Sequence, residues 1–191
     1  MSIFVRQRGI SLIETILFMV IVSVAVIGVT SVFMTTTRSS ADPLVRKQAL
    51  AIAESLLEEV RLMPFTFCDP DDANVYTATG TAGCSVGFVE NMGPDTIAAI
   101  TETRYLAGNP FDNVNDYNGF DSAAAVPAGI CDISGTCIAA LAGYRTQVAV
   151  AATAFNGIPA ADALLITVTV TGPTPEAISL SAIRTRYAPN L

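Results

Sequence analysis

Residues that could do chemistry are few in this 191-residue chain, and histidine is absent. Without histidine, the Ser-His and Cys-His nucleophile systems are excluded. No glycine-rich phosphate loop and no paired-carboxylate motif stands out either. We therefore expect a protein that is not an enzyme, although a carboxylate-based or Lys47-based activity is not forbidden by the composition.

The cysteines are the first group with clear chemistry. All four lie within residues 64–143, and they are Cys68, Cys84, Cys131 and Cys137. An even number of cysteines in a segment expected to face an oxidising compartment predicts disulfides. A zinc site is the rival, but the chain has no histidine and no Cys-x-x-Cys. Of the three possible pairings we choose the sequential one, Cys68–Cys84 with Cys131–Cys137.

Oxygen-bearing side chains crowd the stretch NPFDNVNDYNGFDS, residues 109–122. Closely spaced oxygen ligands are what calcium requires, and the candidate ligands are Asp112, Asn115, Asp116 and Asp121. The spacing does not match the EF-hand loop. Aspartate, asparagine and glycine also form ordinary turns by bonding to their own backbone. We expect turns and no cofactor, with calcium as the alternative, and interpret the aspartates of CDPDDAN (68–74) in the same way.

A lone carboxylate, Glu14, lies near the start of a long apolar run. No formal charge follows it between Thr15 and Thr37, and Arg6 and Arg8 precede the run. A helix over residues 10–33, at about 1.5 Å per residue, would be roughly 36 Å long and could cross a hydrocarbon core of about 30 Å. Positive charge before a membrane span keeps that end in the cytoplasm, so the C-terminal bulk is expected in the periplasm. An ordinary cleaved signal and an uncleaved anchor are the alternatives.

The heptapeptide RGISLIE, residues 8–14, resembles the signal of type IV prepilins and type II secretion pseudopilins. In that family a basic leader ends in glycine, a membrane prepilin peptidase cuts after it, and the new first residue is N-methylated. The fifth mature residue is glutamate. The resemblance implies that residues 1–9 are a leader, that cleavage falls between Gly9 and Ile10, that Ile10 is methylated, and that Glu14 serves assembly. Ile10 departs from the family, which most often begins with phenylalanine.

A physical reason for Glu14 follows from this processing. An ionised side chain in a membrane helix costs about 2.5–3.5 kcal/mol at mid-helix and usually has a partner. Cleavage would create a cationic amine at Ile10, on the same helix face as Glu14. The family resemblance implies that the more consequential partner is the amine of a neighbouring subunit. Alternatively, Glu14 simply interacts with the positive end of the helix dipole.

Residues 10–34 are thus expected to form a transmembrane and assembly helix, and residues 35–63 its amphipathic second half. Asp42 before Pro43 is typical of an N-cap and first helical position, which predicts a break or kink there. The helix should end near Leu62, before Pro64. Apolar residues at spacings of three and four form one face: Val45, Ala49, Ile52, Leu56, Val60 and Met63. A second strip, formed by Leu50, Ala53 and Leu57, would either meet neighbouring subunits or be buried in the same domain.

The remainder divides into a loop-rich region, residues 64–143, and a predicted antiparallel sheet, residues 144–191. The sheet would contain YRTQVAVAATAF, ALLITVTVTG and AISLSAIRTRYA, separated by turns at Asn156-Gly157 and Gly172-Pro173. Their alternation suits a sheet with one face covered, and the preceding helix would cover it. The predicted fold class is α+β, with a long N-terminal helix on an antiparallel sheet and disulfide-linked loops. This arrangement coincides with the type IV pilin fold.

Several longer phrases, among them PFTFCDPDDAN and the RTRY near the end, resemble the MshD-like minor pilins of mannose-sensitive haemagglutinin (MSHA) pili. The resemblance implies a minor pilin that begins as a single-pass inner-membrane protein and ends in the pilus at the cell surface. Its implied partners are the prepilin peptidase, other pilin subunits, the inner-membrane assembly platform and the lipid bilayer. A formal charge of −7 without a basic patch beyond the first residues argues against nucleic-acid binding. The alternatives are a type II secretion pseudopilin and a bitopic inner-membrane protein with a periplasmic binding or enzymatic domain.

Overall fold

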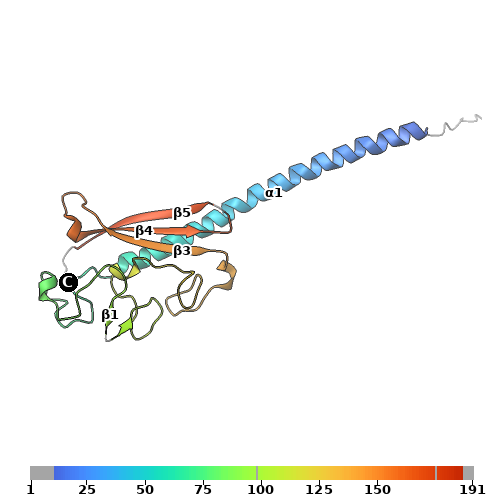
Figure 1. Cartoon of the computed structure of the whole chain (residues 1–191). Helices are drawn as coiled ribbons and strands as arrows, with labels where there is room; N and C mark the ends of the chain where they lie inside the picture. Colours follow the sequence, from blue (N-terminus) through green and yellow to red (C-terminus); the bar gives the residue numbers. More distant parts are fainter. Residues whose placement is uncertain (1–10, 98, 175, 187–191) are drawn as a thin grey trace, which may run out of the picture. The chain divides into compact units, whose positions relative to one another are not determined.

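The computed structural model describes residues 11–97, 99–174 and 176–186, apart from the side chains of residues 35–42. The chain forms two compact units, residues 1–44 and residues 45–191. Helix α1 (Leu12–Leu62) contributes residues to both units, and the strands all belong to the second (Figure 1). The protein is therefore α+β, with one long N-terminal helix, an antiparallel sheet and two disulfides.

Helix α1 is 51 residues long and contains Pro43. The predicted break at Pro43 is wrong, because helical structure continues through it and no second helix begins there. Proline removes one backbone donor and costs roughly 3 kcal/mol inside a helix. The apolar segments on both sides of Pro43 each favour helical structure, and their combined preference outweighs this local penalty. The predicted end is confirmed: α1 stops at Leu62, two residues before Pro64.

The first unit contains the segment Leu12–Met34, which is long and apolar enough to span a membrane, with a mean hydropathy of 2.7. Its large apolar side chains are exposed rather than packed against protein. Two of its hydroxyls bond back to backbone carbonyls of the same helix: Ser23 donates to Met19 at 2.7 Å and Thr30 to Val26 at 2.8 Å. Polar groups satisfied in this way can lie in hydrocarbon, because no donor is left without an acceptor.

The second unit is built on a three-stranded antiparallel sheet in the order β3-β4-β5. The strands are β3 (Arg145–Ala152), β4 (Ala163–Thr171) and β5 (Ala177–Thr185), in agreement with the three predicted segments. The predicted turn between β3 and β4 is confirmed at Asn156 and Gly157, which have φ values of 47° and 85°. Asparagine and glycine are the residues that tolerate this left-handed conformation best.

One face of the sheet is covered by the part of α1 that lies in the second unit. Helix residues Ala49, Ala53, Leu56 and Val60 share a buried core with sheet residues such as Val148, Ile166 and Val168. Burying one leucine, isoleucine or valine side chain of this core stabilises a fold by about 1.5–3 kcal/mol. Of the predicted second apolar strip, Ala53 is fully buried in this core, Leu57 is partly buried, and Leu50 is exposed. The strip is therefore largely part of the domain's own core.

The region between α1 and β3 is loop-rich, as predicted. It contains a small hairpin of β1 (Thr96–Ile97) and β2 (Ile100–Thr101). Its described residues also form short 3-10 helices: η1 (Thr81–Gly83), η2 (Asn115–Tyr117) and η3 (Ala139–Leu141). A further 3-10 helix, η4 (Ala160–Asp162), precedes β4. The rings of Phe111, Tyr117 and Phe120 pack edge to face and join the core. These aromatic contacts anchor the loops to the sheet and helix.

Candidate functional site

The predicted processing site lies outside the described residues, because Arg6, Arg8, Gly9 and Ile10 all fall in residues 1–10. Glu14 is described and lies in the first turn of α1, with its side chain exposed. The backbone N–H of Glu14 donates to the Ser11 carbonyl at 3.0 Å.

Glu14 is the only charged residue between Gly9 and Arg38. Its position in the first turn fits the helix-dipole explanation of this carboxylate. The assembly explanation needs a second subunit and remains a prediction.

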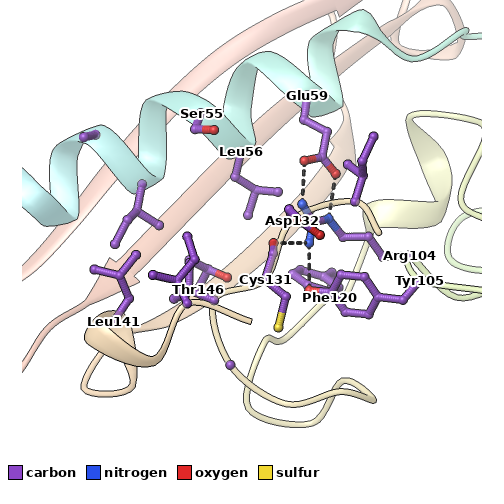
Figure 2. A pocket seen from close by; sticks show the side chains of 16 residues that line it. Ser55, Leu56, Glu59, Arg104, Tyr105, Phe120, Cys131, Asp132, Leu141 and Thr146 are labelled. Atoms are coloured by element: carbon purple, nitrogen blue, oxygen red, sulfur yellow. Dashed lines mark hydrogen bonds and ion pairs between the residues drawn. The ribbon is translucent and has the colours of Figure 1, made fainter. Parts of the chain in front are cut away.

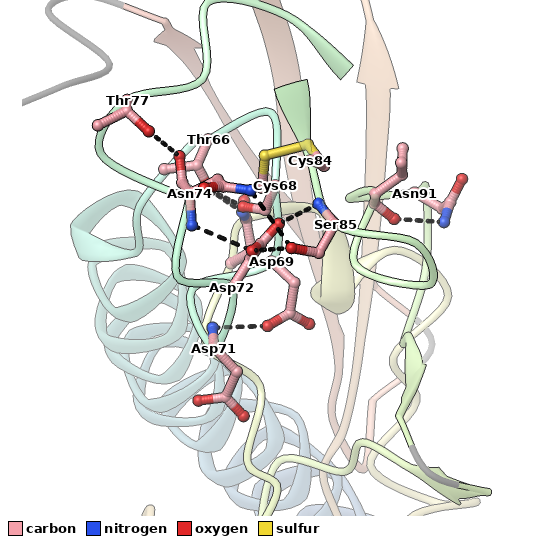
Figure 3. The surroundings of a disulfide bond; sticks show 12 residues. Thr66, Cys68, Asp69, Asp71, Asp72, Asn74, Thr77, Cys84, Ser85 and Asn91 are labelled. Carbon is pink, nitrogen blue, oxygen red and sulfur yellow. Dashed lines mark hydrogen bonds between the residues drawn. A yellow bond between two sulfur atoms is a disulfide. The ribbon is translucent and has the colours of Figure 1, made fainter. Parts of the chain in front are cut away.

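The structure joins Cys68 to Cys84, which is the first of the sequential pairs. Figure 3 shows that the bond closes a loop organised by Asp72. Asp72 Oδ2 accepts from the Ser85 backbone at 2.7 Å, and its Oδ1 accepts from the Ser85 hydroxyl at 2.8 Å and from the Asn74 backbone at 3.0 Å. This part of CDPDDAN is therefore a turn, as expected.

Cys131 is joined to Cys137, the second sequential pair. Asp132 holds the loop between them, because its Oδ1 accepts from the backbone N–H groups of Ser134 and Thr136, both at 2.9 Å. Both disulfides thus close loops that already have their own turn hydrogen bonds.

Seven carboxylates from separate loops converge in the second unit. They form three overlapping triads, and within each triad one oxygen per residue lies within 4.8 Å of the others. We call this set the acidic cluster: Asp69, Asp71, Glu90, Asp95, Glu102, Asp112 and Asp116. The triads are Asp69–Glu90–Asp95, Asp69–Asp71–Asp112 and Glu102–Asp112–Asp116. Asp69 and Asp112 each belong to two triads and connect the set.

Backbone pairing brings the loops of the acidic cluster together. The residues on either side of Cys68 pair with the segment around Val89, so that the Asp69 N–H donates to Phe88 O at 3.0 Å and the Glu90 N–H to Phe67 O at 3.1 Å. Cys68, which forms the disulfide with Cys84, lies within this pairing. Asp69 and Glu90 are thereby held side by side.

Two further segments complete the acidic cluster. The hairpin β1–β2 is closed by a 3.0 Å bond from the Glu102 N–H to Asp95 O. The loop before η2 folds over Asp116, whose Oδ2 accepts from the N–H groups of Asp112 and Asn113 at 3.0 and 2.7 Å. The Gly93 N–H donates to Asn115 O at 3.0 Å and joins the two segments.

Several oxygens of these loops are buried without a hydrogen-bond donor. They are one carboxylate oxygen each of Asp69, Glu90, Asp112 and Asp116, and the amide oxygens of Asn113 and Asn115. Asp69 and Asp116 are each only 1% exposed. Among the described residues, no salt bridge reaches the acidic cluster. The charge of Arg186 acts on Glu90, but Arg186 is itself paired with Asp162 at 3.5 Å.

The electrostatics of the cluster reflect this crowding. Burial raises the pKa of Asp112 to about 7, and the charges of Asp69 and Asp116 contribute. Burial also raises the pKa of Glu102, as do the neighbouring charges of Asp116 and Asp112. The pKa of Glu90 is raised by burial first and by the charge of Asp116 second. Burial and mutual repulsion thus favour the protonated form of these carboxyl groups, and the shared hydrogen bond of Glu102 and Asp116 is consistent with a shared proton.

The calcium candidates from the sequence divide between two places. Asp112 and Asp116 belong to the acidic cluster, and Asn115 lies next to it with an unpaired amide oxygen. Asp121 is engaged elsewhere: Arg145 Nε donates to its two carboxylate oxygens at 2.9 and 3.2 Å, and Arg145 Nη2 also pairs with it. The Asp121 Oδ1 also accepts from the Ala123 N–H at 3.0 Å, which is the expected turn.

A buried ion pair between Arg104 and Glu59 lines a cavity of about 450 Å³ (Figure 2). Arg104 donates from Nε and Nη2 to the two carboxylate oxygens of Glu59, both at 2.6 Å. Tyr117 also donates to Glu59, at 2.8 Å. Burial alone would lower the pKa of Arg104, but the bonds and charge of Glu59 outweigh it and hold that pKa above its ordinary value.

Sequence reasoning missed both partners of this ion pair. Glu59 directly follows Glu58 in the sequence, and Arg104 lies 45 residues further along the chain. The only signal was a charged residue interrupting the apolar neighbours Leu56, Leu57 and Val60.

Comparisons with known proteins give no family. No protein-family model matches the chain, and neither a curated protein nor a solved structure matches it.

Proposed function

We propose that this chain is a minor pilin of a type IV, MSHA-like pilus, cut by the prepilin peptidase between Gly9 and Ile10 and assembled through its N-terminal helix. The observation that carries the proposal is the lone carboxylate Glu14, five residues after Gly9 and at the start of a helix segment that can span a membrane. The α+β second unit, with its helix-covered antiparallel sheet and two disulfides, is compatible with a pilin-like head.

The proposed mechanism follows from the cost of the Glu14 charge. In a membrane this carboxylate lacks a partner within Leu12–Met34, where every other residue is uncharged. Processing supplies a cationic amine at Ile10, and the amine of an adjoining subunit pairs with Glu14 when that subunit docks in register. An ion pair in a low-dielectric medium is much stronger than one in water. A costly isolated charge is thereby converted into an interaction that favours assembly.

The test is incorporation of Glu14 variants into fibres. Glu14→Ala and Glu14→Gln proteins should insert and be processed like the wild type, yet reach the sheared-fibre fraction poorly in immunoblots. Ser23→Ala is the matched control, because it removes a polar group from the same segment without removing a charge. Wild-type amounts of Glu14→Ala in fibres would contradict the assembly role.

The same features would serve a type II secretion pseudopilin, whose fibre stays in the periplasm. Labelling intact cells with an antibody against residues 45–191 separates the two functions. Surface-exposed fibres support the pilus, whereas labelling only after the outer membrane is opened supports the pseudopilus.

A further inference from the structure

We propose that the cavity of about 450 Å³ beside the Glu59–Arg104 pair binds a small organic amine with an aromatic or apolar body, whose ammonium group pairs with Asp132. The inference rests on the second unit alone and stands apart from the proposed assembly function. Sites for small molecules are concave and mostly apolar, contain a few polar groups that fix the ligand, and have volumes of about 300–1,000 Å³. The cavity lies at the lower end of this range, which suits a ligand with one or two rings.

The walls of the cavity are mainly apolar and come from separate parts of the second unit. Helix α1 contributes Leu56, and the chain between α1 and β3 contributes Phe120, Ile130, Ile138 and Leu141 (Figure 2). Apolar surface of this kind gains free energy when an apolar body displaces water from it. The hydrophobic part of a ligand would therefore cover Leu56 and Phe120.

The wall that carries Asp132 is held in place without a ligand. The Cys131–Cys137 disulfide closes this loop, and the Ile138 N–H donates to Ile130 O at 2.9 Å across it. The side chain of Ile138 is 49% exposed, so the cavity is open to solvent beside this wall. A preformed and accessible site favours binding, because little conformational freedom is lost when the ligand enters.

The charged groups of the lining favour a cation. They are the carboxylates of Glu59 and Asp132 and the guanidinium of Arg104, which together leave one negative charge. Arg104 offers little to an anion, because it already donates to Glu59, to the Tyr105 hydroxyl and to Cys131 O. An anionic ligand would therefore meet two carboxylates and a guanidinium that is already paired.

Asp132 has one carboxylate oxygen left for a ligand. Its Oδ1 accepts from the N–H groups of Ser134 and Thr136, both at 2.9 Å, whereas no donor among the described residues reaches its Oδ2. The bond from the Ser134 hydroxyl, at 2.7 Å, holds the pKa of Asp132 below its ordinary value, so this carboxylate is charged at neutral pH. An ammonium group at the mouth of the cavity can thus pair with Oδ2.

Three ligands with the same body test the class of ligand: phenylethylamine, phenylethanol and phenylacetate. Their affinities for the full chain in detergent are measured at neutral pH by ligand-detected NMR titration. Because Asp132 is exposed, the ammonium should add no more than an exposed ion pair supplies. We expect the amine to bind about two- to fivefold more tightly than the alcohol, and phenylacetate to bind more weakly than both.

Tryptophan substitutions locate the site. Ala51 is an exposed residue of α1 that lines the cavity, so Ala51→Trp should fill the space and abolish binding of the amine. Leu50→Trp is the matched control, because the neighbouring Leu50 is also exposed but lies outside the lining, and it should bind like the wild type. Uptake of ligand by detergent micelles is the same for both variants and cancels. Ile138→Trp fills the cavity from the disulfide-closed loop and takes the place of Ala51→Trp if that variant fails to fold.

An isosteric substitution identifies the ammonium partner. Asp132→Asn keeps an Oδ1 acceptor for the turn, and it should lower the affinity for the amine to that for the alcohol. Glu54→Gln removes a helix carboxylate outside the lining and should leave both affinities unchanged. Equal binding of the amine to Ala51→Trp and Leu50→Trp, or no binding to the wild type at millimolar concentration, would overturn the site. An affinity for phenylethanol or phenylacetate equal to that for the amine would overturn the assignment to a cationic ligand.

Discussion

Replacing Arg104 with methionine should destabilise the second unit, because the buried Glu59 carboxylate would lose its positive partner. The side chains of Arg104 and Glu59 are only 8% and 15% exposed. After the substitution, the 2.8 Å bond from the Tyr117 hydroxyl would be the one hydrogen bond described for the Glu59 carboxylate. Arg104 also donates from Nη1 to the Tyr105 hydroxyl at 2.7 Å and to Cys131 O at 3.0 Å, and these bonds would be lost as well.

The expected loss is about 3 kcal/mol. Removing one partner of a buried ion pair typically costs about 3–5 kcal/mol. The adjacent cavity of about 450 Å³ would let water reach the unpaired Glu59 carboxylate, so we expect a loss at the lower end of that range. For a chain of this size, about 3 kcal/mol lowers the unfolding midpoint by roughly 6–12 °C.

Thermal unfolding of the full chain in detergent, followed by tyrosine circular dichroism, measures this loss. Arg61→Met is the matched control, because it makes the same change in the pair between Arg61 and Glu58, whose side chains are 51% and 60% exposed. Such an exposed pair is worth about 0–1 kcal/mol. The double variant Glu59→Gln/Arg104→Met should be more stable than the sum of the single losses predicts. An Arg104→Met midpoint no lower than that of Arg61→Met would refute the reasoning.

Three further predictions concern the second unit. Replacing Cys68 and Cys84, which are 16 residues apart, with alanine should cost about 3 kcal/mol of unfolding free energy in the chain-entropy picture, measured by denaturant titration against the unreduced wild type. Arg145 lowers the pKa of Asp121 to about 2. A carboxylate with a depressed pKa stabilises the fold above its unfolded pKa of about 4, and this contribution is lost as the pH falls through the folded pKa. The difference in unfolding midpoint between the wild type and Asp121→Asn should therefore shrink as the pH falls from 5 toward 2. Gly172→Ala should cost about 1–3 kcal/mol, because the added Cβ would lie 3.0 Å from a ring carbon of Tyr144, whereas Gly108→Ala, with open space around it, should change the midpoint little.

The local elements could be predicted because neighbouring residues determine them. Alternation of apolar and polar residues located β3, β4 and β5, and Asn156-Gly157 located a turn that needs positive φ. Pro64 indicated the end of α1 correctly. Pro43 misled the prediction, because a local penalty of one residue was weighed without the helical preference of long segments on both sides.

The clustered sites were only partly predictable, because they depend on loops that meet in the folded chain. Asp112 and Asp116 were recognised from their spacing, since both lie in one short stretch. Glu90 and Glu102 were missed. Backbone hydrogen bonds to Phe67 and Asp95 bring them to the cluster, and no periodic pattern in the sequence predicts such pairing between loops. Asp121 does not join the cluster, because its carboxylate is paired with Arg145, a residue 24 positions further along the chain.

The most direct test of the proposed pilin function is the mass of the N-terminal peptide of the protein purified from membranes. Trypsin cuts after Arg8 and Arg38, and no lysine or arginine lies between them. The account predicts a peptide that starts at Ile10, ends at Arg38 and carries one methyl group on its amine. A peptide that starts at Gly9 and is unmethylated would show that the leader was retained, and it would contradict the proposal.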